Sequence, residues 1–90
     1  MTHYVVTCEK RIDSEWYTES QEITHDLSIA RNAVASMVAN FGEGHSDWNV
    51  KYSTLDSFRA ESACGRFSTC FFVNAIKEIE LGCDNKRQFD

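Results

Sequence analysis

The sequence predicts a small α+β domain, in which one helix packs on one face of an antiparallel sheet of four to five strands. Two observations lead to this prediction. One segment carries apolar residues at helical spacing, and the segments on either side of it alternate as strands do. The expected element order is β-β-α-β-β, with a final short strand as an optional addition.

The first two strands are expected to form a hairpin. Residues 3–10 are rich in β-branched and aromatic side chains, which is typical of a strand. The polar segment that follows predicts a turn near Asp13 and Ser14, because short polar side chains favour turns. Residues 15–23 alternate again and supply the second strand of the hairpin.

A helix is predicted to begin after Thr24 to Asp26, whose side-chain oxygens can cap it, and Gly42 is expected to end it. Its apolar positions recur every three or four residues, and this stripe predicts a helix lying on a sheet. The stripe consists of Leu27, Ala30, Val34, Met37, Val38 and Phe41. The side expected to face water carries Ser28, Arg31, Asn32, Ala35 and Ala39.

The remaining strands are expected in the second half. Residues 48–54 alternate, so that Trp48, Val50 and Tyr52 should point inward. Residues 55–65 fit a short helix or a hairpin, and their serines and glycine favour the hairpin or an irregular segment. Residues 66–73 become apolar on both sides toward the end of the segment, as in a central strand or one covered by a partner. Residues 76–81 either continue that strand beyond a bend at Asn74 or form the last strand.

Length and composition indicate one folded unit. Ninety residues suffice for one domain, expected over residues 1–82, with residues 83–90 as a flexible tail. No apolar run reaches the length of a membrane span, and the N-terminus lacks the pattern of a signal peptide. These features predict a cytoplasmic protein whose four cysteines are reduced.

The sequence contains no recognisable catalytic or metal-binding constellation, so we expect a protein that is not an enzyme and has no cofactor. Cys64 and Cys70 would lie about 20 Å apart on a continuous strand, and only a turn at Gly65 would bring them together. His45, between Glu43 and Asp47, is interpreted as a solvated loop residue rather than a general base. The aromatic residues are interpreted as core, since a net charge of −5 disfavours direct nucleic-acid binding.

All of the net charge lies in the first half of the chain. Residues 1–50 contain eight acidic and three basic residues, whereas residues 51–90 contain six of each. Five carboxylates of the first half are expected to form one acidic ridge along the hairpin turn, the second strand and the helix entry. The ridge consists of Asp13, Glu15, Glu19, Glu22 and Asp26. It serves either to protect an edge strand or to attract a basic partner.

These observations predict a binding module or stoichiometric inhibitor whose acidic ridge engages a basic protein surface, such as the nucleic-acid groove of a host protein. An anti-CRISPR-like protein of a phage or mobile element, acting in the host cytoplasm, would be one example. Two alternatives stay open. One is a thiol-based metal or redox protein that uses Cys64 and Cys70, and the other is a homodimer joined near Phe71 and Phe72.

Overall fold

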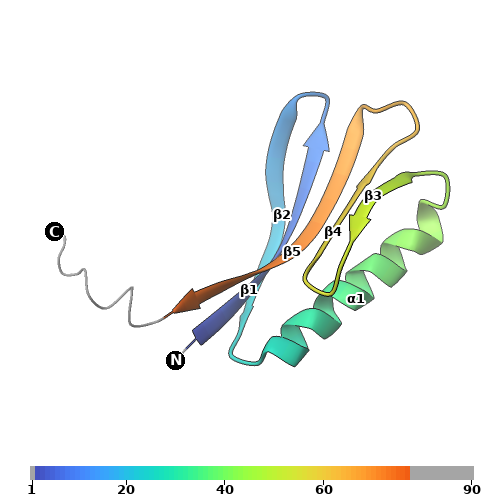
Figure 1. Ribbon diagram of the computed structural model, residues 1–90. Coiled ribbons are helices and arrows are strands. Elements are labelled where there is room, and N and C mark those ends of the chain that lie inside the picture. The colour runs from blue at the N-terminus through green and yellow to red at the C-terminus, as the bar shows by residue number, and fades with distance from the viewer. Residues whose placement is uncertain (1, 78–90) are drawn as a thin grey trace, which may run out of the picture.

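The computed structural model describes residues 2–77 as one antiparallel sheet with a helix lying across one of its faces (Figure 1). This arrangement confirms the predicted α+β class. The elements are β1 (Thr2–Ile12), β2 (Glu15–Thr24), α1 (Leu27–Gly44), β3 (Asn49–Ser53), β4 (Ser57–Glu61) and β5 (Phe67–Lys77).

The five strands are arranged in the order β2-β1-β5-β4-β3. β1 and β5 form the centre of the sheet and pair antiparallel without interruption from Thr2↔Lys77 to Ile12↔Phe67. β2 and β3 are the two edges, and every residue of β3 is exposed. We call the side of the sheet under α1 the helix side and the other the open face.

The hairpin between β1 and β2 turns at the predicted position, because Ile12 pairs with Glu15 across the two intervening residues. Asp13 adopts a positive φ of 57°, a conformation that short polar residues tolerate better than most others. Its backbone N–H donates to the Arg66 carbonyl oxygen at 2.7 Å, which ties this turn to the loop before β5.

α1 begins as predicted, since the Asp26 carboxylate accepts a hydrogen bond from the Ser28 N–H at 2.9 Å. The prediction that Gly42 ends the helix is wrong, because the helix continues to Gly44. Gly42 does not adopt positive φ and serves as an ordinary helical residue. His45 caps the C-terminal end of α1, since its Nδ1 donates a hydrogen bond to the Phe41 carbonyl oxygen at 2.8 Å. α1, the one helix within residues 2–77, does not combine the length and the hydropathy needed to cross a membrane.

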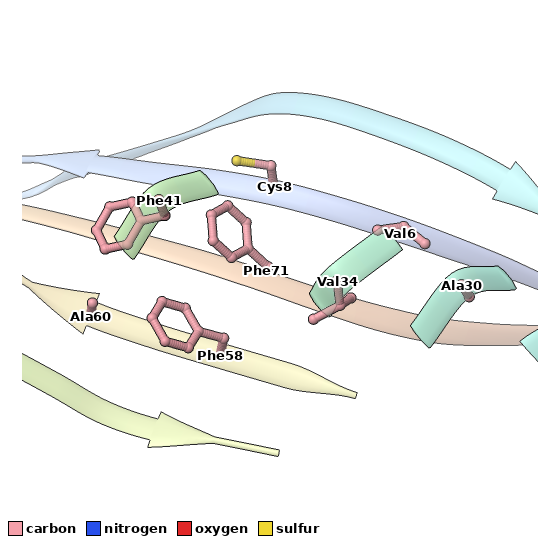
Figure 2. Packing of buried hydrophobic residues seen from close by; sticks show 8 residues of the cluster. All are labelled: Val6, Cys8, Ala30, Val34, Phe41, Phe58, Ala60 and Phe71. Carbon is pink, nitrogen blue, oxygen red and sulfur yellow. The ribbon is translucent and has the colours of Figure 1, made fainter. Parts of the chain in front are cut away.

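The core lies between α1 and the helix side of the sheet (Figure 2). Ala30, Val34 and Phe41 of the predicted stripe are buried against residues of three strands. The Phe41 ring meets Phe58 and Phe71 edge to face, at centroid distances of 5.9 and 6.1 Å. The buried cluster consists of Val6, Cys8, Ala30, Val34, Phe41, Phe58, Ala60 and Phe71.

The prediction that Val50 and Tyr52 point inward is wrong, since their side chains are 59% and 46% exposed. β3 is an edge strand, and its register with β4 shifts between these two residues. Val50 pairs with Ala60 and Tyr52 with Arg59, so the two side chains point to opposite sides of the sheet. Only Trp48, which precedes the strand, packs against the core.

The hairpin interpretation of residues 55–65 is confirmed, because β4 lies within this segment and pairs with β5. β5 is the predicted central strand. It continues through Asn74 in unbroken register with β1, as expected if residues 76–81 extend the strand. Residues 78–81 of that prediction, and the predicted tail at 83–90, lie outside the described residues.

Replacement of Phe41 should test this core. Phe41→Ala should lower the free energy of unfolding by about 3 to 5 kcal/mol, because it removes a buried ring that four other aromatic side chains contact. Urea denaturation followed by circular dichroism measures the change. The control is Ile29→Ala on the exposed side of the same helix, which should change it by less than about 0.5 kcal/mol. Equal effects of the two substitutions would contradict this placement of the core.

Candidate functional site

The five residues of the predicted acidic ridge lie along β2 and at its two ends. Asp13 occupies the turn before the strand, Asp26 caps the helix after it, and Glu15, Glu19 and Glu22 lie within the strand. A ten-residue strand is about 33 Å long at about 3.3 Å per residue. The carboxylates therefore form a line along one edge of the sheet rather than a compact patch.

Two of the five have structural roles at the ends of this line. The Asp13 carboxylate accepts two hydrogen bonds from Arg66, at 2.9 and 3.3 Å, and these contacts hold its pKa below the usual range. Hydrogen bonds from Ser28 likewise lower the pKa of Asp26 at the start of α1. Both carboxylates hold loops and termini in place.

Glu19 lies at a β-bulge. The register of β1 with β2 shifts between Cys8, which pairs with Ser20, and Glu9, which pairs with Thr18, so Glu19 has no partner residue of its own. Its Oε1 accepts a hydrogen bond from the Cys8 thiol at 3.3 Å and lies 3.3 Å from Lys10 Nζ. Glu19 is therefore directed to the helix side of the sheet.

The bulge also decides where the other carboxylates of β2 point. Simple alternation would place Glu15 and Glu19 on one side and Glu22 on the other. Because of the extra residue, Glu22 pairs with Val6, which belongs to the core under α1. All three glutamates therefore lie on the helix side, and we call them the acidic strand. Within residues 2–77, Glu15 and Glu22 are exposed and have no ion-pair partner.

A groove borders the acidic strand on the helix side. Its larger part is a hollow of about 330 Å³ between α1 and strands β1 and β2, where buried Phe41 and Phe71 meet polar side chains. A second hollow of about 180 Å³ adjoins it, because Lys10 and His45 line both. The larger hollow is lined by Cys8, Lys10, Glu19, Ser20, Met37, Asn40, Phe41, His45 and Phe71.

The end of α1 adds negative potential to this groove. A helix carries partial negative charge at its C-terminus, and the last turn of α1 contains no basic residue. His45 caps this end and is half-buried, with its ring stacked on Phe41 at a centroid distance of 4.1 Å. It is thus not the freely solvated loop residue that we expected from the sequence.

The open face has a different character. Three cations from three strands surround Glu61: Arg11, Arg59 and Lys51 lie 3.4, 3.5 and 3.6 Å from its carboxylate oxygens. The Arg59 guanidinium also lies over the Trp16 ring, 5.3 Å from its centroid. Since Trp16 is on β2 and Arg59 on β4, this contact crosses β1 and β5. Ser68, which is buried on this face, accepts a hydrogen bond from Arg11 at 2.9 Å.

The described cysteines do not form a common site. Cys8, Cys64 and Cys70 are all free thiols, and no group of three or more metal-ligating residues occurs within residues 2–77. Cys64 is exposed in the loop before β5, whereas Cys70 is buried in that strand opposite Arg59. The turn at Gly65 thus leaves the two thiols apart. Cys83 lies outside the described residues.

The thiols also differ in their expected reactivity. Burial and the neighbouring Glu19 raise the pKa of Cys8 to about 12, and burial raises the pKa of Cys70. The hydrogen bond with Ser62 lowers the pKa of Cys64, and Arg66 contributes to the same effect. Cys8 is therefore no nucleophile at neutral pH, although it lines the larger hollow of the groove.

Comparisons with known proteins add no assignment: no family model, no curated protein and no solved structure matches the chain.

Thiol labelling should test this description. In a Cys83→Ser background, Cys64 should react with a maleimide at least about tenfold faster than Cys8 and Cys70, because a thiolate is the reactive species. Mass spectrometry of digested samples measures the rate at each residue. Unfolding in urea should make the three rates similar. Fast labelling of Cys8 in the folded protein would contradict its burial beside Glu19.

Proposed function

We propose that the protein is a binding module without catalytic activity, which engages a basic segment of a partner protein along β2. The observation that carries this proposal is the position of the acidic strand. β2 is an edge of the sheet, so one row of its backbone N–H and C=O groups has no neighbouring strand among the described residues. Glu19 lines a groove that has an apolar floor, and Glu15 and Glu22 lie on the same side of β2.

Backbone pairing along an exposed edge is a common way to recognise an extended peptide. The edge supplies hydrogen bonds, and the side chains next to it select the sequence. Here Glu15, Glu19 and Glu22 favour cationic side chains. An inhibitor of a host protein, including one of the anti-CRISPR kind, would use such a surface against a basic cleft, and this role remains a prediction.

The same carboxylates disfavour pairing of β2 with a second copy of itself. In such a pair, glutamates of one copy would lie near glutamates of the other, and like charges across strands are destabilising. Of the predicted homodimer contact near Phe71 and Phe72, Phe71 is buried in the protein's own core, whereas Phe72 is partly exposed. A basic partner therefore fits the acidic strand better than a second copy does.

Charge reversal on β2 should test the proposal. The probe is a fluorescently labelled peptide of alternating lysine and valine, which favours an extended conformation, and binding is measured by fluorescence anisotropy. Glu15→Lys/Glu22→Lys should weaken binding at least about tenfold, because about 1.4 kcal/mol corresponds to a factor of ten. Added salt should also weaken binding of the unmodified protein.

Two controls separate a specific surface from general charge attraction. Glu43→Lys/Asp47→Lys makes the same change in net charge at the end of α1 and in the following loop, and it should weaken binding less than the β2 double variant does, because these residues lie outside β2. A peptide of alternating glutamate and valine should not bind. Equal losses in the two double variants, or binding that is insensitive to salt, would contradict the proposal.

A further inference from the structure

Glu19 presents an unused oxygen atom at the edge of the larger hollow. Both of its described contacts, with the Cys8 thiol and with Lys10 Nζ, involve Oε1. Oε2 takes part in neither of these two contacts. The carboxylate is therefore held in position by one oxygen while the other can accept a further donor.

The Cys8 contact favours the charged form of this carboxylate. The raised pKa of Cys8 means that its thiol stays protonated and donates throughout the neutral range. The same hydrogen bond lowers the pKa of Glu19, so its carboxylate stays ionised under the same conditions. A fixed negative charge thus lies beside an apolar floor that includes Met37, Phe41 and Phe71.

This combination suits a long side chain with a cationic tip. Lysine and arginine bury their aliphatic stems on apolar surface and keep the charged group at its edge. A hollow of about 330 Å³ is near the lower end of the range of about 300 to 1,000 Å³ for small-molecule sites, so its size suits one side chain. Glu19 lies where the cationic tip of such a side chain would be.

Lys10 now partly neutralises Glu19. Their side chains are 33% and 50% exposed, and ion pairs with this exposure contribute little stability. An incoming cation can therefore share or replace this contact with little loss of stability. Lys10 would also repel that cation, because both would approach the same carboxylate.

We propose that the hollow beside Glu19 receives one lysine or arginine side chain of the basic partner, and that Lys10 is a tethered competitor for this position. The inference rests on the proposed function and names the side chain that the groove selects. Removing the charge of Lys10 should therefore strengthen binding, which is the opposite of the effect expected if Lys10 only supported the fold.

Single substitutions should test this inference with the same lysine-valine peptide. Lys10→Met keeps an apolar stem without the charge and should strengthen binding about five- to tenfold. Glu19→Gln keeps the shape without the charge and should weaken it about tenfold. The matched control is Lys51→Met, which removes a half-exposed lysine that also pairs with a glutamate, at 3.6 Å from Glu61 on the open face. It should change the affinity by less than about twofold.

The outcomes distinguish the inference from the proposed function. If Glu15→Lys/Glu22→Lys weakens binding but Lys10→Met does not strengthen it, the inference is wrong and the proposed function stands. If the unmodified protein does not bind the peptide, both are wrong. Thermal unfolding of each variant verifies folding. If Glu19→Gln unfolds, the affinity of Lys10→Met alone tests the inference. Lys10→Met keeps an apolar side chain at position 10 and leaves the Cys8 contact with Glu19 in place.

Discussion

The pairing of β1 with β5 is the constraint on which the rest of the structure depends. It joins the two ends of the described chain in the middle of the sheet, and its register fixes which residues face α1. Val6 and Phe71 lie on the helix side because of this register, and both belong to the same core cluster as Phe41. β2 and β4 add to the outer edges of this central pair, so their positions follow from it. A shift by one residue would exchange the two faces of the sheet.

The two faces are stabilised by different interactions. On the helix side, burial of apolar side chains dominates, and the aromatic contacts of Phe41 organise the core (Figure 2). No described element covers the open face, where the ion pairs of Glu61 and the contact of Arg59 with Trp16 link strands that are not adjacent. The open face therefore gathers cations, while the acidic strand lies on the opposite side. A net charge of −5 conceals this division.

Much of the fold could be predicted from the sequence because periodicity directly reflects burial. The stripe from Leu27 to Phe41 identified the helix, and the apolar residues on both sides of Phe71 identified a central strand. Local rules failed where neighbouring elements decide the outcome. Glycine often ends helices, but here α1 continues past Gly42 to Gly44. Val50 and Tyr52 alternate as buried residues do, but they belong to an edge strand with a shifted register.

The candidate site was only partly predictable for the same reason. The five carboxylates were identified as one ridge, but two of them hold structural elements in place through Arg66 and the start of α1. The groove joins residues of β1, β2, α1 and β5 that are far apart in the sequence. The bulge at Glu19 has no local signal that we can identify. It nevertheless controls which side chains of β2 face α1. If the bulge lay beyond Glu22 instead, that carboxylate would point to the open face, although the amino-acid composition would be unchanged. The position of the bulge in β2 thus decides which face of the sheet carries the negative charge, and two chains with the same charged residues could present them on opposite faces.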